Sequence, residues 1–179
     1  RIGSCVRDVS QVRCVVGEDG VEIGVLMRDT RHHEQAFQLK RDAIREVLDR
    51  SSALTALGLT IQVREPEFYP IHVMLWVRPV PGQDLAGVRR RIGQALDRFL
   101  DPGTGCFGGT GWRMGALPTQ AQIRACLQAE VPGIRLVELV VAAAAPQGRE
   151  QDPAGIRDPF ALPLGGDYTV FSVEKRDAP

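Results

Sequence analysis

LDPGTGCFGGTGWRMGAL occupies residues 100–117, and the helical patterns of the chain end just before this stretch and begin again just after it. The stretch, called the glycine loop below, holds six glycines and the large side chains Phe107, Trp112 and Met114. A long loop without secondary structure of its own is uncommon in a compact domain unless it has a function. Two interpretations follow: a glycine-rich cradle for a ligand, or a shaped structural insert that carries aromatic side chains.

The composition is that of an ordinary globular protein. The 179 residues are 44% hydrophobic and 25% charged, and 22 basic residues balance 22 acidic ones. A chain of this length can bury an adequate core without a disulfide or metal, and a neutral balance argues against a dedicated nucleic-acid binder. No apolar run reaches the ~20 residues that a membrane-spanning helix needs. The cysteines form no CxxC pair, so we expect reduced, mostly buried thiols.

The N-terminal part of the chain predicts a hairpin, a helix and a third strand. Two alternating apolar runs, residues 12–16 and 21–27, flank Asp19-Gly20, a dipeptide typical of two-residue hairpin turns. Apolar residues at helical spacing then predict a helix over residues 34–51, and alternation predicts a strand over residues 59–64.

Two adjacent histidines, His32 and His33, precede this predicted helix in a polar segment. A metal site would need further ligands from elsewhere in the chain, and adjacent side chains point in different directions. We therefore expect both histidines to be solvated loop residues.

The remainder of the chain predicts a second, similar unit. Asp84 is the expected N-cap of one helix, and Thr119 and Gln122 have the spacing of a capping box at the start of another. The predicted elements are a strand over residues 71–77, a helix over 84–100, the glycine loop, a helix after Thr119, a strand over 134–143, and a last strand or hairpin over 160–173.

Together these elements predict an α+β fold made of two small modules with the orders ββαβ and βα-loop-αβ(β). Helices are expected to cover one face of mixed or antiparallel sheets. We place the modules at residues 1–66 and 67–179, with a flexible linker over residues 144–159.

The glycine loop contains a literal match to the dinucleotide fingerprint G-x-G-x-x-G at residues 103–108. That motif works where the glycines follow a strand and open a helix, whose N-terminus binds the pyrophosphate. Here the glycines follow a helix, and no helix can begin until after Pro118. A small-ligand or nucleotide-binding enzyme that uses residues 103–111 is therefore the alternative function rather than the favoured one.

No other motif predicts catalysis. His72 shares a predicted strand face with Met74 and Trp76, without a nucleophile pattern nearby. Cys106 lies beside Phe107, and nothing in the sequence predicts a base that would activate its thiol. We expect no catalytic residues, no cofactor and no metal site.

Four residues of the glycine loop are candidates for packing or for contact with a partner: Phe107, Trp112, Arg113 and Met114. Large aromatic side chains bury much area, and tryptophan and arginine are over-represented among the residues that dominate protein interfaces. Either the side chains insert into the chain's own core or they anchor a neighbouring protein.

The residues around the loop resemble a known family. The segments that carry the resemblance are Phe99-Leu-Asp-Pro, residues 105–109, Gly-Trp-Arg-Met-Gly at residues 111–115 and Val-Pro-Gly-Ile at residues 131–134. They resemble the C-terminal part of baseplate J-like proteins, the wedge proteins of contractile phage tails and of related injection systems, including tailocins and type VI secretion. Two departures are Met114, where the family commonly has a bulkier aromatic residue, and the long linker over residues 144–159.

The resemblance implies a non-enzymatic structural protein. Such wedges are made in the bacterial cytoplasm and repeat around a six-fold baseplate, where their partners are other baseplate subunits. The resemblance implies neither a cofactor nor a nucleic-acid partner. It also leads us to expect that this chain, which starts at Arg1, is the C-terminal portion of a longer wedge protein.

Overall fold

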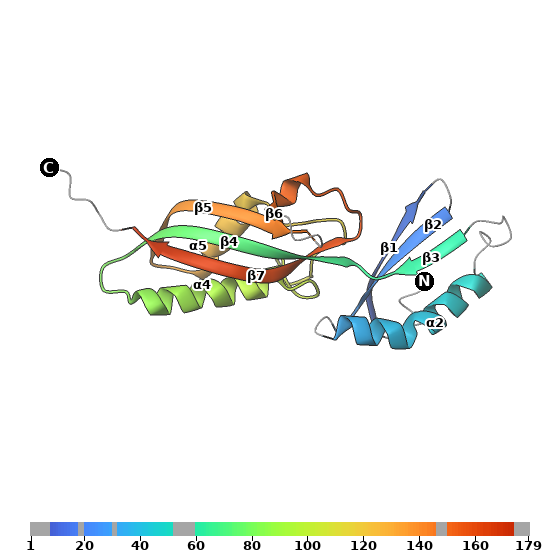
Figure 1. Cartoon of the computed structure of the whole chain (residues 1–179). Coiled ribbons are helices and arrows are strands. Elements are labelled where there is room, and N and C mark those ends of the chain that lie inside the picture. Colours follow the sequence, from blue (N-terminus) through green and yellow to red (C-terminus); the bar gives the residue numbers. More distant parts are fainter. Residues whose placement is uncertain (1–7, 18–19, 30–31, 52–59, 146–149, 174–179) are drawn as a thin grey trace. The chain divides into compact units, whose positions relative to one another are not determined.

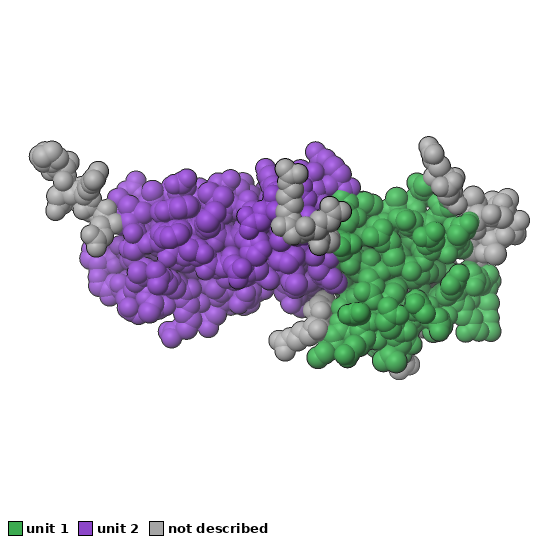
Figure 2. All heavy atoms as spheres, viewed as in Figure 1, with its two compact units in different colours: residues 1–67, 113–115, 158–162 green, residues 68–112, 116–157, 163–179 purple. Residues whose placement is uncertain are grey.

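The computed structural model describes residues 8–17, 20–29, 32–51, 60–145 and 150–173, and the chain divides into two compact units (Figure 2). Unit 1 comprises Arg1–Glu67, Arg113–Gly115 and Asp158–Leu162, and unit 2 comprises Phe68–Trp112, Ala116–Arg157 and Pro163–Pro179. Within these ranges, three helices and two sheets, of three and four strands, confirm the predicted α+β fold (Figure 1).

The described residues of unit 1 form a three-stranded sheet and one helix. Its elements are β1 (Val9–Val16), β2 (Gly20–Met27), α2 (His33–Ser51) and β3 (Thr60–Arg64). The antiparallel pairing of β1 with β2 confirms the hairpin, and β3 pairs with β2 in parallel. The turn residue Asp19 lies outside the described residues.

One face of this sheet packs against α2. Alternation along β2 places apolar side chains on one side, and a helical stripe of α2 meets them. The buried residues of this core are Val9, Val21, Ile23, Val25, Met27, Phe37 and Ile44.

The opposite face of β2 is filled by two short segments from much later in the sequence. A Cβ atom on Gly24 would lie 2.3 Å from Cδ1 of Phe160 and 3.1 Å from Sδ of Met114. Both of those side chains are buried, and the Arg64 guanidinium carbon lies 4.8 Å from the centre of the Phe160 ring. The sequence placed residues 113–115 and 158–162 in the C-terminal module, whereas the structure groups them with unit 1, in which Met114 and Phe160 lie against Gly24.

Unit 2 contains a four-stranded sheet in the order β6-β5-β4-β7. Its elements are β4 (Glu67–Pro79), α4 (Leu85–Leu100), α5 (Gln120–Glu130), β5 (Ile134–Ala144), β6 (Glu150–Gln151), the 3-10 turn η1 (Pro153–Gly155) and β7 (Ala161–Ser172). β4 and β5 are antiparallel, whereas β4 and β7 run in the same direction (Figure 1).

Helices α4 and α5 cover one face of this sheet (Figure 1). Asp84 caps α4 by accepting hydrogen bonds from the amides of Ala86 and Gly87 at 3.2 and 2.8 Å. Thr119 and Gln122 form the predicted capping box of α5. The buried side chains of α4 are Val88, Ile92, Ala95, Leu96, Phe99 and Leu100. Within the described ranges, no helix combines the length and apolar character that a membrane crossing requires.

The C-terminal part of unit 2 differs from prediction in two places. β7 runs as a single strand through Gly165 and Gly166, so the hairpin alternative is wrong. The described part of the predicted linker carries β6 and η1, whose N-cap Asp152 accepts from the Ala154 amide at 2.9 Å. Residues 146–149 lie outside the described part of the chain.

His33 is buried, which corrects the expectation of a solvated loop residue. It is the first residue of α2, one position earlier than the predicted start, and only 4% of its surface is exposed. Its ring stacks with that of Phe37, with centroids 6.2 Å apart. His32 is exposed as expected, and its Nδ1 lies 3.2 Å from Oδ2 of Asp29.

The stability of the protein is expected to fall as the pH decreases below about 6.5, the ordinary His33 value. Burial lowers the pKa of His33 in the folded state, although a backbone hydrogen bond with Val25 opposes the shift. The unfolded chain therefore binds this proton at a higher pH than the folded chain. The free energy of unfolding then declines by up to about 1.4 kcal/mol per pH unit between the unfolded and folded pKa values.

Urea titrations of the wild type and His33→Leu between pH 7.5 and 5 measure this effect. Burial and the nearby charge of Glu34 raise the pKa of Glu65, so Glu65 changes the free energy of unfolding with the opposite sign at lower pH. Both proteins contain Glu65, and the difference between their pH dependences therefore isolates the effect of His33. If the free energy of unfolding had the same pH dependence in both proteins, His33 would not be the group responsible.

Candidate functional site: the glycine loop

Asp101 organises the start of the glycine loop. It is the C-cap residue of α4, and its Oδ1 accepts hydrogen bonds from the amides of Gly103 and Thr104 at 2.9 and 2.7 Å. The Thr104 hydroxyl donates to the same oxygen at 2.9 Å. A carboxylate of the chain itself therefore occupies the place where a phosphate cradle would receive its anion.

The following amides of the loop donate to carbonyl groups of the same segment. The bonds are Gly105 to Asp101 at 2.8 Å, Cys106 to Phe99 at 2.9 Å, Gly109 to Cys106 at 3.5 Å, Gly111 to Gly105 at 3.0 Å and Trp112 to Pro102 at 3.0 Å. A phosphate site needs backbone amides that point toward the ligand. In this loop those amides stabilise the loop.

Two glycines are required by close approaches of the backbone. A Cβ atom on Gly105 would lie 2.3 Å from the Phe99 carbonyl oxygen and 2.4 Å from that of Asp101. Gly111 has a φ of 79°, and its Cβ atom would lie 2.6 Å from the Gly103 carbonyl oxygen. Close backbone approaches within the loop therefore account for these two glycines.

Phe99, at the end of α4, is the centre of an aromatic cluster. The Trp112 ring meets it edge-on at 5.3 Å, and the Phe107 ring meets it at 5.1 Å. The Trp112 indole also donates a hydrogen bond of 2.7 Å to the Phe99 carbonyl. Phe99 and Asp101 were not among the candidate site residues predicted from the sequence, although Phe99 ends the apolar stripe of α4 and Asp101 opens the loop.

The four candidate residues of the loop have different environments. Trp112 is 3% exposed and packs in unit 2, whereas Met114 is 2% exposed and packs in unit 1. Arg113 is exposed. Phe107 remains 52% exposed, so it is the one large apolar side chain among the four that is accessible to a partner.

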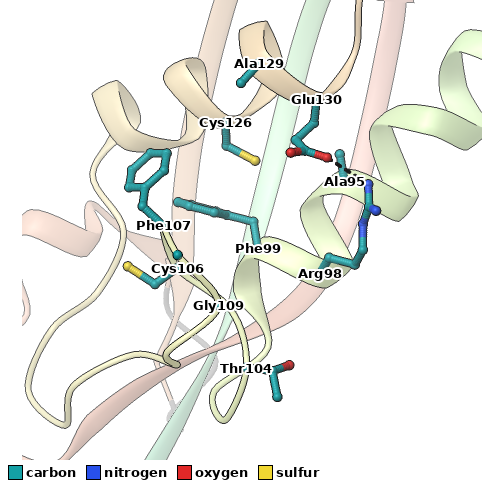
Figure 3. Close-up of a pocket in the computed structure, with 11 residues that line it drawn as sticks. Ala95, Arg98, Phe99, Thr104, Cys106, Phe107, Gly109, Cys126, Ala129 and Glu130 are labelled. Carbon is teal, nitrogen blue, oxygen red and sulfur yellow. Dashed lines mark hydrogen bonds and ion pairs between the residues drawn. The ribbon is translucent and has the colours of Figure 1, made fainter.

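A cavity of about 300 Å³ lies between the glycine loop and the two helices. Figure 3 shows Phe107 of the loop, Phe99 of α4 and Cys126 of α5 around it. Arg98 and Glu130 form an ion pair of 3.0 Å beside it. The lining combines apolar side chains with one pair of opposite charges.

The three described cysteines have different environments. Cys126 is buried, and burial, with a smaller contribution from Glu130, raises the pKa of its thiol to about 11. Cys106 lines the cavity and is half-buried, with a φ of 62°. Cys14 is exposed, which contradicts the expectation of mostly buried thiols, because β1 has few buried positions. Among the described residues, no group of three potential metal ligands is present.

His72 lies on the sheet face opposite the helices, as the alternation predicted. Its Nδ1 accepts a hydrogen bond of 3.1 Å from the Asp167 amide and lies 3.5 Å from the Asp167 carboxylate. Trp76, on the same face, stacks on Phe171 with ring centroids 5.0 Å apart. The glycine loop and His72 thus belong to different surfaces of unit 2.

A scan of the chain against protein-family models finds no match, and no curated protein matches it either. The resemblance to baseplate J-like proteins therefore stays a prediction that rests on the residues quoted above.

Replacing Asp101 with alanine is expected to lower the free energy of unfolding by about 1.5–3 kcal/mol, because it removes the acceptor of three hydrogen bonds. Asp101→Asn keeps one side-chain oxygen and should lose less than half as much. Urea denaturation followed by circular dichroism measures both. An Asp101→Ala variant as stable as the wild type would contradict the role of Asp101 as the acceptor of these hydrogen bonds.

Proposed function

We propose that this protein is a structural baseplate component of a contractile tail or injection machine and that it acts through protein–protein contacts of the glycine loop. The observation that carries the proposal is the position of Phe107, a half-exposed aromatic side chain on a loop braced by its own hydrogen bonds.

Such a side chain has the properties of an interface anchor. Aromatic residues are enriched in the cores of protein interfaces, and a rigid loop loses little conformational freedom when a partner binds. The contact of Phe107 with Phe99 fixes the ring beside the cavity. A partner can cover the exposed side of Phe107 and insert a side chain into the cavity at the same time.

The class of assembly comes from the resemblance of the segments quoted above, between residues 99 and 134, to baseplate J-like wedge proteins. The protein would be made in the bacterial cytoplasm and incorporated into a phage-tail-like particle or baseplate, with other wedge subunits as partners. The absence of enzymatic activity is part of this proposal.

The internal hydrogen bonds of the loop weigh against the alternative, a nucleotide-binding enzyme. A bound phosphate would have to displace the Asp101 carboxylate from the amides of Gly103 and Thr104. A rise in the thermal unfolding midpoint on addition of nucleotides would favour that alternative.

Phe107→Ala tests the proposal. We expect the variant to fold normally and to lower the yield of assembled particles by about tenfold or more, since removal of an interface anchor weakens binding by about 1.4 kcal/mol or more. Val80→Ala is the matched control, because Val80 is a similarly exposed apolar residue of unit 2 outside the loop. Normal assembly of a folded Phe107→Ala variant would remove the loop from the proposed contact.

A further inference from the structure

The outer edge of β5 is paired over only a small part of its length. β5 pairs with β4 from Ile134 to Ala143, but on its other side only Ala143 and Ala144 pair with β6. Figure 1 shows β6 beside the last part of β5 alone. Over the described residues, no strand accompanies the outer edge from Ile134 to Ala142.

The direction of the backbone groups follows from the register. The Val77 carbonyl accepts from the Val173 amide at 2.9 Å, so the backbone amide and carbonyl groups of Val77 are directed toward β7. Successive residues of a strand direct their amide and carbonyl groups to opposite sides. Leu75 and Val73, two and four positions before Val77, therefore also direct their backbone groups toward β7. Their partners across the ladder, Leu139 and Val141, must then direct their groups away from β4, to the outer edge.

An observed hydrogen bond agrees with this direction. The side-chain amide of Gln120, in the first turn of α5, donates to the Leu139 carbonyl. A side chain therefore supplies at this position the hydrogen bond that a neighbouring strand would otherwise make.

The edge borders a groove of about 630 Å³. It is lined by residues 137–142 of β5, by Gln120 and Arg124 of α5, and by residues 150–152. The features that normally block an edge are charged side chains, proline and bulges. In β5 such features lie before Leu139. They are the charged residues Arg135 and Glu138 and the register shift of the ladder with β4. From Leu139 to Ala144 the edge has neither charge nor proline.

The charges of the groove indicate the composition of an occupant. Glu138, Glu150 and Asp152 line it together with a single basic residue, Arg124. All three acidic residues are exposed, and within the described part of the chain Glu138 and Glu150 form no ion pair.

We propose that this edge binds an extended, basic segment of another polypeptide, which adds to the sheet as a strand beside β5. The backbone groups of Leu139 and Val141 form its hydrogen bonds, and the acidic residues of the groove attract its lysines or arginines. This site is separate from the glycine loop and does not depend on the proposed baseplate function.

The test uses the complete chain and a synthetic seven-residue peptide of alternating valine and lysine, N-methylated at every second residue. This peptide keeps one hydrogen-bonding edge and cannot associate with itself into sheets. We expect it to slow amide hydrogen exchange at Leu139 and Val141 at least tenfold, as measured by NMR. A control peptide that is N-methylated at every residue should have no effect.

Two variants sharpen the test. Gln120→Ala frees the Leu139 carbonyl, so it should bind the peptide about three- to tenfold more tightly. Glu138→Lys combined with Glu150→Lys should weaken binding about two- to fivefold or more. Unchanged exchange at Leu139 and Val141 with millimolar peptide would overturn the proposal, as would equal binding of the fully methylated control.

Discussion

Replacing Trp112 with alanine is expected to lower the free energy of unfolding by about 3–5 kcal/mol, the usual effect of truncating a buried aromatic side chain. The indole is almost fully buried and meets Phe99 edge-on. The substitution removes this contact, leaves a cavity beneath the loop and deletes the hydrogen bond to the Phe99 carbonyl. Urea denaturation followed by far-ultraviolet circular dichroism measures the loss.

Two matched variants separate the contributions. Trp112→Phe retains most of the packing and should lower the free energy of unfolding by roughly 1 kcal/mol. The loss is small because the Phe99 carbonyl still accepts a hydrogen bond from the Cys106 amide. Phe107→Ala should also lose roughly 1 kcal/mol, since half of that side chain is exposed. If Trp112→Ala were no more destabilising than Phe107→Ala, the loop would not be anchored by its tryptophan.

Replacing Gly24 with alanine is the second large effect we expect. The added methyl group would overlap the Phe160 ring, which is fully buried. Overpacking of this kind usually costs about 1–3 kcal/mol, and the Met114 sulfur on the same side of the strand limits the room for adjustment. The measurement is again the free energy of unfolding from urea titration.

Gly93→Ala is the control for Gly24→Ala, and we expect it to raise the free energy of unfolding. Gly93 lies within α4, and its Cβ atom would meet no atom within 4 Å. Alanine should therefore stabilise the helix by about 0.5–1 kcal/mol. Phe160→Leu in the Gly24→Ala background should recover part of the loss, with an interaction energy of about 0.5 kcal/mol or more. A fully additive double variant would contradict the placement of Phe160 over Gly24.

The regular elements could be predicted from sequence because their signals are local. The alternation around β2, the Asp84 cap and the Thr119 capping box each depend on residues a few positions apart. A hydrogen-bonded cap or an amphipathic face follows from side-chain chemistry and spacing alone.

The contacts that the sequence could not predict join distant residues. Nothing near Gly24 indicates that Phe160 and Met114 cover it, since these residues are more than eighty positions away. The same holds for His33, whose burial depends on where α2 begins and on its packing with Phe37. In the glycine loop, the composition predicted a shaped insert, but only the structure separates buried Trp112 and Met114 from half-exposed Phe107.

The central claim is that Phe107 contacts another protein in an assembled baseplate. Site-specific incorporation of the photoreactive analogue p-benzoylphenylalanine at position 107, followed by irradiation of purified particles and mass spectrometry, tests it most directly. We predict crosslinks from position 107 to a second baseplate subunit, and none from the same analogue at Val80. Efficient assembly with crosslinks only within the chain would contradict the claim.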